Sequence, residues 1–234
     1  MRNLLIPALA LLFVLAGCAD TDTASDATDS AAMADMEAAA GTGEWTTLFE
    51  GESADAFPKH GGAATYRIEN GTVVGTTAPN SENAFLCTNE TFGDFELEFE
   101  TMVHDSLNSG VQIRSHVRQE DDRVYGPQVE IEAGGAEGTE SGYIYGEALD
   151  TGWLTPEEEL QPHTSFRDGE WNRYRIVAQG PRIQTWINGE SIADLTNEEI
   201  YADHQEGLIC LQVHGIGDAG PWEVSWRNVR VREL

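Results

Sequence analysis

Basic residues are scarce in this chain of 234 residues. Lys and Arg together number 13 against 41 Asp and Glu, so the formal net charge at pH 7 is −28. A surface of this sign repels phosphate groups, which argues against nucleic acid and anionic membrane surfaces as partners. The acidic excess fits either a salt-rich habitat or plain solubility, and neither reading gives most of the carboxylates a catalytic role.

Cysteine is rare as well, with three copies at positions 18, 87 and 210. The sequence contains no CxxC pair and no His–Cys cluster, which argues against a structural zinc site. Cys87 and Cys210 lie far apart in the chain, so the sequence allows a disulfide between them without demonstrating one. We interpret Cys210 as a packed or bridged thiol rather than as a nucleophile.

Long hydrophobic runs are absent apart from one near the first residue. The apolar stretch 4–16 follows a single Arg and is too short to span a bilayer as a helix. It leads into Leu-Ala-Gly-Cys at 15–18, which resembles a bacterial lipobox. We therefore expect residues 1–17 to be a signal peptide and Cys18 to be lipidated. The protein would then be anchored in the bacterial cell envelope, on the periplasmic side or at the surface, and a plain secretory signal is the alternative.

Aromatic residues are missing from residues 18–43, which consist mainly of Asp, Thr, Ser, Ala and Gly. Such a stretch buries too little apolar surface to offset the entropy of ordering, so we predict a flexible acidic tether. Aromatic and branched apolar residues become frequent from Trp45 onward. We predict that residues 44–234 form one domain, because their number suits a single substantial core.

Helix signals are few in residues 44–234, where only 155–160 and 197–201 are typical of short helical turns. Strand signals are frequent. Apolar and polar residues alternate along Phe95–Glu100, and the Asn-Gly pairs at 70–71 and 188–189 indicate tight hairpins. Alternating strands without crossover helices favour antiparallel sheets. We predict an all-β fold, a two-sheet antiparallel jelly-roll sandwich.

Three of the predicted strands carry polar residues of an unusual kind. In residues 111–116, 128–132 and 209–214, Val, Ile and Leu alternate with Arg, Gln, Glu and His. Side chains two apart on a strand share a face, so each strand presents one polar face. An ordinary wet face carries Lys, Thr and Ser, whereas this set is suited to hold and deprotonate a polar ligand.

Glu130 and His214 are the candidate catalytic residues. Glu130 lies between Gln128 and Glu132 on one face, where mutual repulsion raises a carboxyl pKa and favours a general base. A solvated outer strand is the alternative. His214 has the side chain that titrates near neutrality, although a His before a Gly also serves as a packing residue.

Six further residues are predicted to bind the substrate on these faces or in the Gly-rich loop that follows the second strand. The guanidinium of Arg114 offers a fork of donors, and the aromatic faces stack on a sugar ring. The alternatives are a structural ion pair of Arg114 with Glu130 or Glu132, and core packing of the aromatic residues. The predicted substrate ligands are Arg114, Gln128, Glu132, Gln212, Tyr145 and Trp153.

Seven short motifs follow one another in an order that resembles the 3-keto-disaccharide hydrolase family. Each motif is weak alone, but the ordered set is specific and covers residues 44–234. The motifs are Asn108–Arg114, Gly126–Ile131, Ser141–Gly146, Gly169–Ile176, Trp186–Gly189, Leu211–Gly215 and Trp226–Arg230.

The resemblance implies a concanavalin-like jelly roll with the ligand on a concave sheet face. It also implies cleavage of glycosides whose glucosyl C3 hydroxyl is oxidised to a ketone. Such a ketone acidifies the C2 proton, so a base eliminates the C1 substituent and water then adds. One departure concerns the second strand, where relatives carry an acidic residue, Gln and Asp, but this chain carries Gln128, Glu130 and Glu132. Whether Glu130 or His214 takes the proton stays open.

Two other functions remain as alternatives. A carbohydrate-binding, lectin-like module uses the same fold without an acid/base pair. An ordinary glycoside hydrolase needs two apposed carboxylates, which Glu130 and Glu132 would have to supply from one strand. No cofactor is predicted, although carboxylates of residues 126–146 offer ligands to a divalent cation. The oligomeric state is not indicated by the sequence.

Overall fold

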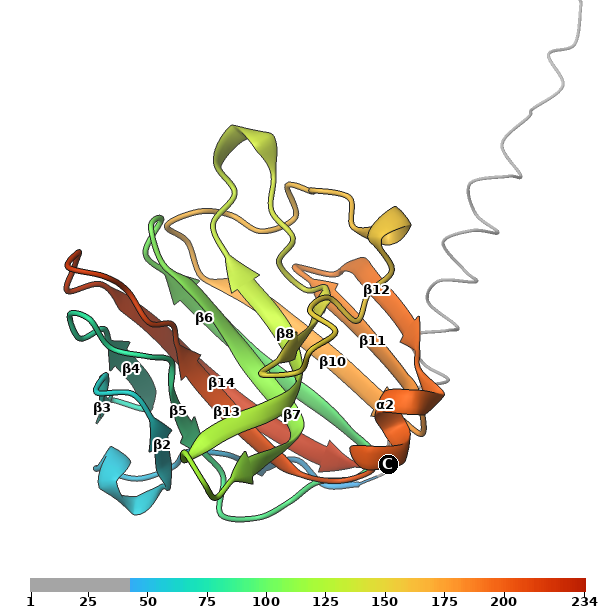
Figure 1. Ribbon diagram of the computed structural model, residues 1–234, viewed down its shortest axis with the longest axis horizontal. Coiled ribbons are helices and arrows are strands. Elements are labelled where there is room, and N and C mark those ends of the chain that lie inside the picture. The colour runs from blue at the N-terminus through green and yellow to red at the C-terminus, as the bar shows by residue number, and fades with distance from the viewer. Residues whose placement is uncertain (1–42) are drawn as a thin grey trace, which may run out of the picture. The chain divides into compact units, whose positions relative to one another are not determined.

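The computed structural model describes residues 43–234, which form an all-β unit of two antiparallel sheets (Figure 1). The signal peptide, the lipidation of Cys18 and all of the tether except its last residue lie outside the described residues. None of the helices in residues 43–234 is long and apolar enough to cross a membrane.

The larger sheet has eight strands. They are β1 (Thr46–Thr47), β3 (Thr65–Glu69), β4 (Thr72–Thr76), β6 (Phe95–Val103), β10 (Asn172–Gln179), β11 (Arg182–Ile187), β12 (Glu190–Thr196) and β14 (Glu223–Glu233). Their order is β12–β11–β10–β6–β14–β4–β3, and β1 pairs with β14.

The smaller sheet has six strands, in the order β2–β5–β13–β7–β8–β9. They are β2 (Lys59–Gly61), β5 (Ala84–Cys87), β7 (Asn108–Arg118), β8 (Arg123–Glu132), β9 (Ile144–Glu147) and β13 (Leu208–Val213). All three strands predicted to carry the polar faces, β7, β8 and β13, are neighbours at the centre of this sheet (Figure 1).

Helical turns are short, in keeping with the few helix signals. They are η1 (Ala54–Ala56), η2 (Gly135–Glu137), η3 (Glu157–Glu159) and α2 (Glu198–Asp203). The predicted turns at 155–160 and 197–201 are therefore confirmed, and Asn197 caps α2 by accepting a hydrogen bond from the amide of Ile200.

The core lies between the sheets and is built by strand alternation. On β8, Val129 and Ile131 are fully buried and belong to one cluster with Leu97 and Ile176 of the opposite sheet. Their neighbours along β8 point the other way, because successive side chains alternate across a sheet. The two-sheet jelly-roll prediction is confirmed, and core packing thereby fixes which residues of β8 reach the outer face.

Two hairpin turns form as their Asn-Gly pairs predict. Asn188 and Gly189 both have left-handed backbone angles, with φ of 54° and 91°, and join β11 to β12. Such angles suit the right-handed twist of the flanking strands. Cys87 and Cys210 face each other across β5 and β13 and form a disulfide, which answers the question left open by the sequence.

Candidate active site

A pocket lies on the outer face of the six-stranded sheet, over β7, β8 and β13. Its volume is about 430 Å³, within the range of small-molecule sites. The pocket collects polar groups from strands distant in the sequence. It is lined by Asn83, Asn108, Arg123, Gln128, Glu130, Glu132, Tyr145, Glu147, Ala148, Leu149, Trp153 and His214.

The structure brings seven of the eight predicted catalytic and substrate-binding residues together. Six line the pocket directly, namely Gln128, Glu130, Glu132, Tyr145, Trp153 and His214. Gln212 is fully buried beneath them, where its Nε2 atom donates to Gln128 Oε1 at 2.8 Å. The eighth residue, Arg114, lies elsewhere.

Arg114 does not share the polar face, and the prediction that placed it there is wrong. The register of β7 against β8 shifts between Gln112 and His116, and Arg114 within this bulge has a φ of 47°. A bulge changes the face on which the following side chains appear. The guanidinium is 2% exposed and donates to Asp94 Oδ1 at 2.8 Å and to the carbonyl of Gly93 at 2.7 Å. Arg114 therefore serves the packing of the sandwich.

A chain of buried amides forms the floor of the pocket. Gln112 Nε2 and Gln212 Nε2 both donate to Gln128 Oε1, at 2.5 and 2.8 Å. Gln128 Nε2 in turn donates to Glu130 Oε2 at 2.8 Å. Since its oxygen is already engaged by two donors, the Gln128 amide has one allowed orientation.

Glu147 determines which way the hydrogen bonds between these amides point, because it contacts Gln212 at one end of the series. This carboxylate forms an ion pair with Arg123, with 2.6 Å between Oε1 and Nη2, so it acts as an acceptor. Gln212 Nε2 therefore donates to Glu147 Oε2, at 3.2 Å. Donation runs from Gln212 through Gln128 to Glu130, and Glu130 Oε2 always accepts. A proton on Glu130 accordingly belongs on Oε1, the oxygen next to Asn108.

Glu130 holds a proton at neutral pH. Burial raises the pKa of its carboxyl to about 8; hydrogen bonds from Gln128 and Asn108 act against this, and the nearby charges of Glu132 and Glu147 add to it. Asn108 Nδ2 donates to Glu130 Oε1, and its amide has to turn over when that oxygen carries the proton. A carboxyl with a pKa near the working pH is suited to general acid/base catalysis.

His214 lines the pocket and is held by the carbonyl of the next residue. Its Nδ1 atom lies 2.7 Å from the carbonyl oxygen of Gly215, which only accepts hydrogen bonds. Nδ1 therefore carries the proton in the neutral ring, and Nε2 is the basic nitrogen. The Gly215 amide donates to Asn83 Oδ1 at 2.8 Å, which holds this turn in place.

One side of the pocket is apolar and aromatic. The rings of Tyr145 and Trp153 meet edge to face, with centroids 5.4 Å apart, and both residues line the pocket beside Ala148 and Leu149. An aromatic pair of this kind offers a flat surface for a sugar ring or an apolar substituent. The predicted aromatic contact surface is therefore adjacent to the acid/base groups.

Sequence reasoning missed four polar residues of the pocket, which are Asn83, Asn108, Arg123 and Glu147. Asn108 heads β7 and contacts Glu130. The other three meet through hydrogen bonds to Glu147, which strand alternation alone does not predict. No group of three or more His, Cys, Asp or Glu side chains placed to hold a metal ion occurs in residues 43–234.

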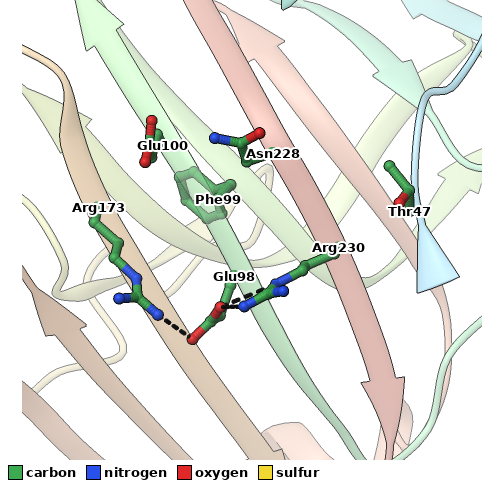
Figure 2. Close-up of a pocket in the computed structure, with 7 residues that line it drawn as sticks. All are labelled: Thr47, Glu98, Phe99, Glu100, Arg173, Asn228 and Arg230. Atoms are coloured by element: carbon green, nitrogen blue, oxygen red, sulfur yellow. Dashed lines mark hydrogen bonds and ion pairs between the residues drawn. The ribbon is translucent and has the colours of Figure 1, made fainter. Parts of the chain in front are cut away.

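A second hollow of about 450 Å³ lies over the eight-stranded sheet (Figure 2). Figure 2 shows Glu98 held between Arg173 and Arg230, with 2.7 Å from Arg173 Nη2 to Glu98 Oε1. Burial raises the pKa of Glu98, but the hydrogen bonds from both arginines outweigh it and keep the pKa below its ordinary value. These charges neutralise one another, and no His lines the hollow, so it offers no acid/base pair.

Comparison with known proteins gives a family and a fold. The sequence profile of the 3-keto-alpha-glucoside-1,2-lyase-like domain matches residues 44–232. No curated protein matches the chain.

Three solved structures illustrate the fold. A candidate glycosyl hydrolase from Parabacteroides distasonis has a TM-score of 0.56 at 17% identity, covering 81% of this chain and 94% of its own. A Bacillus subtilis protein of unknown function with a galectin-like fold has a TM-score of 0.58 at 9% identity, with the same coverage. The carbohydrate-binding module CBM66 from Bacillus subtilis has a TM-score of 0.51 at 12% identity, covering 81% and 95%. At these identities the likeness concerns the fold.

Proposed function

Because this chain belongs to the family of 3-keto-alpha-glucoside-1,2-lyase-like domains, we propose that it cleaves the glycosidic bond of 3-keto-glycosides, 3-keto-disaccharides among them, in bacterial carbohydrate catabolism. A carbohydrate-related function follows from the family itself. The observation that supports cleavage is an acid/base pair in one pocket, a protonated Glu130 and a His214 whose Nδ1 is engaged by the carbonyl oxygen of Gly215.

The proposed reaction is an elimination followed by hydration. His214 Nε2 takes the proton from C2, which the adjacent C3 ketone acidifies, and the electron pair moves onto the C3 oxygen as an enolate. The enolate then reforms the ketone, the C1–oxygen bond breaks, and Glu130 Oε1 gives its proton to the leaving oxygen. Water adds across the resulting C1=C2 bond and yields the 3-keto sugar.

The assignment of acid and base rests on two observations. Glu130, with a pKa of about 8, starts the cycle protonated and so begins as the acid. The hydrogen bond from His214 Nδ1 to Gly215 leaves Nε2 as the basic atom. After the elimination His214 carries the proton and Glu130 lacks it, and water addition returns both to their starting states.

A carbohydrate-binding module is the rival that the fold itself favours, since a binding module shares it. Binding alone requires amides and aromatic faces but no protonated carboxyl beside a histidine. An ordinary glycoside hydrolase would need carboxylates on opposite sides of the bond. Glu130 and Glu132 instead project from one strand, and Asn108 Nδ2 contacts both.

The purified protein should be incubated with matched glucosides that differ only in a hydroxyl or a ketone at C3, and sugar release followed by chromatography. Release from the keto form alone is the expected result. Binding of the keto form without turnover would sink the hydrolase proposal, and turnover of the unoxidised glucoside would favour an ordinary glycosidase. His214→Ala and Glu130→Gln should each lower kcat by about 10²- to 10⁴-fold.

A further inference from the structure

The proposed reaction needs a hydrogen-bond donor at the C3 oxygen that neither the acid nor the base supplies. When the C2 proton leaves, negative charge collects on the C3 oxygen, and donors aimed at that atom lower the barrier. Glu132 also lines the pocket, and Glu130 becomes an anion during the cycle. Both oppose an enolate nearby, so a cationic donor is favoured at the C3 oxygen.

Arg123 is the single Lys or Arg among the described residues that line the pocket. Its Nη2 atom pairs with Glu147 Oε1 at 2.6 Å, and the side chain is 28% exposed. Its Nε–H is buried and has no hydrogen-bond partner within residues 43–234. A buried donor without a partner is uncommon. The guanidinium thus keeps N–H groups available for a ligand oxygen.

Glu147 and Asn83 connect Arg123 to the turn at His214. Its Oε1 accepts from Arg123 and, at 3.2 Å, from Asn83 Nδ2. Asn83 Oδ1 accepts from the amide of Gly215, the residue after His214. Among the described residues, hydrogen bonds connect Glu130 to Glu147 through the amides of the floor. Arg123 is thus linked to the turn of the C2 base through fewer side chains than to Glu130, which fits a place at the C3 oxygen, next to C2.

We propose that Arg123 is a catalytic residue that binds the C3 oxygen and stabilises the enolate, and that Glu147 is the positioning residue that aims it. This inference rests on the proposed function and deepens it. In the step concerned, the C2–H bond breaks, the proton passes to His214 Nε2, and the C2=C3 bond forms as the C3 oxygen becomes negative. Arg123 supplies hydrogen bonds and charge, and it exchanges no proton.

The test isolates this step with a 3-keto sugar that carries hydrogen in place of the oxygen substituent at C1. This compound has no leaving group, so the enzyme can only exchange its C2 proton with solvent. Exchange in D₂O is followed by proton NMR. Arg123→Met should slow exchange by about 10²- to 10³-fold, as expected for loss of one oxyanion donor. Arg123→Lys should retain part of the rate, because charge is kept and the fork is lost.

Arg118→Met is the matched control. Arg118 pairs directly with Arg123 in the β7–β8 register, but it is exposed and forms its ion pair with Asp121. Its exchange rate should equal that of the unaltered protein.

Thermal melting of each variant shows whether the domain is folded, and added guanidinium should restore exchange in Arg123→Ala. Glu147→Gln should lower kcat with little change in KM, and guanidinium should not rescue it.

The outcomes separate this inference from the proposed function. If the unaltered protein neither exchanges the C2 proton nor cleaves 3-keto-glycosides, the proposed function fails. If it does both and folded Arg123→Met exchanges at the full rate, the role of Arg123 is overturned while the function stands. Loss of cleavage with full exchange would assign Arg123 to the leaving group and equally overturn the inference.

Discussion

The side chain of Gln128 lies directly over Gly110 on the neighbouring strand, where a Cβ atom would come within 2.4 Å of Gln128 Cδ. Gly110→Ala should therefore displace Gln128 and break its hydrogen bonds to Gln212 and Glu130. We expect kcat to fall about 10- to 100-fold, because the acid loses its fixed orientation.

The control for this prediction is Gly217→Ala. A Cβ at position 217 meets nothing within 4 Å. Its kcat and melting temperature should stay unchanged. Both variants are compared by steady-state kinetics at one pH, and an unaltered kcat in Gly110→Ala would show that Gln128 does not orient the acid.

Glu130→Gln should stabilise the protein while it lowers the activity. The pKa of Glu130 is about 8 in the folded state and near 4.5 in the unfolded chain, so between these values the folded state binds more protons. The free energy of unfolding therefore falls as pH rises through this window, by up to about 1.4 kcal/mol per pH unit. A neutral Gln at position 130 removes this fall in the free energy of unfolding. Its amide is accommodated when the side-chain amide of Asn108 flips.

Urea unfolding of both forms at several pH values between 5 and 8 provides the measurement. The stability gain of Glu130→Gln should grow with pH and reach a few kcal/mol near pH 8. A gain that is constant across this range would contradict the raised pKa.

The activity should fall on the alkaline side of about pH 8. Above its pKa, Glu130 loses the proton that the leaving oxygen requires, so kcat should drop about tenfold per pH unit. Residual activity of Glu130→Gln should lack this fall. A fall that persists in Glu130→Gln would assign it to another group.

Arg114→Met should destabilise the protein without altering the chemistry. The substitution leaves Asp94 and the carbonyls of Gly93 and Gly180 without their buried donor. We expect a loss of about 3 kcal/mol in the free energy of unfolding and a kcat per folded molecule within about twofold. Arg118→Met, which breaks an exposed pair, should cost less than about 1 kcal/mol. A lower kcat at an unchanged free energy of unfolding would show that Arg114 contributes to catalysis.

Cys18→Ser should prevent lipidation and release the protein from the membrane. Residues 15–18 resemble the lipobox pattern, in which the cysteine is lipidated. Partition between detergent and water, with mass spectrometry of the N-terminal peptide, checks the prediction. Equal partition of both forms would favour a plain secretory signal.

Strand periodicity predicted most of the polar face. Core packing of Val129 and Ile131 forces Gln128 and Glu130 outward, and alternation along the chain reveals this without any structure. The same rule failed at Arg114 because a bulge in β7 reverses the alternation of side chains. The left-handed backbone angle of Arg114 in this bulge is not indicated by any sequence pattern.

The sequence did not indicate Arg123 and Glu147 as pocket residues, for a different reason. Each stands near an end of its strand, beside turn residues, where charged side chains are ordinarily solvated. Their 2.6 Å contact depends on the path of β8 and β9 around the pocket, a long-range property that local patterns do not encode. The pairing of Cys87 with Cys210 likewise depended on the sheet order.

The disulfide between Cys87 and Cys210 has a consequence for the pocket two residues further along the chain. Gln212 and His214 follow Cys210 on and just beyond β13, at spacings of two and four. A slip of one residue would turn both side chains toward the core. A covalent link at Cys210 forbids that slip against β5, so oxidation of one thiol pair fixes which way the proposed base faces. Oxidative folding would then be a condition for the proposed activity.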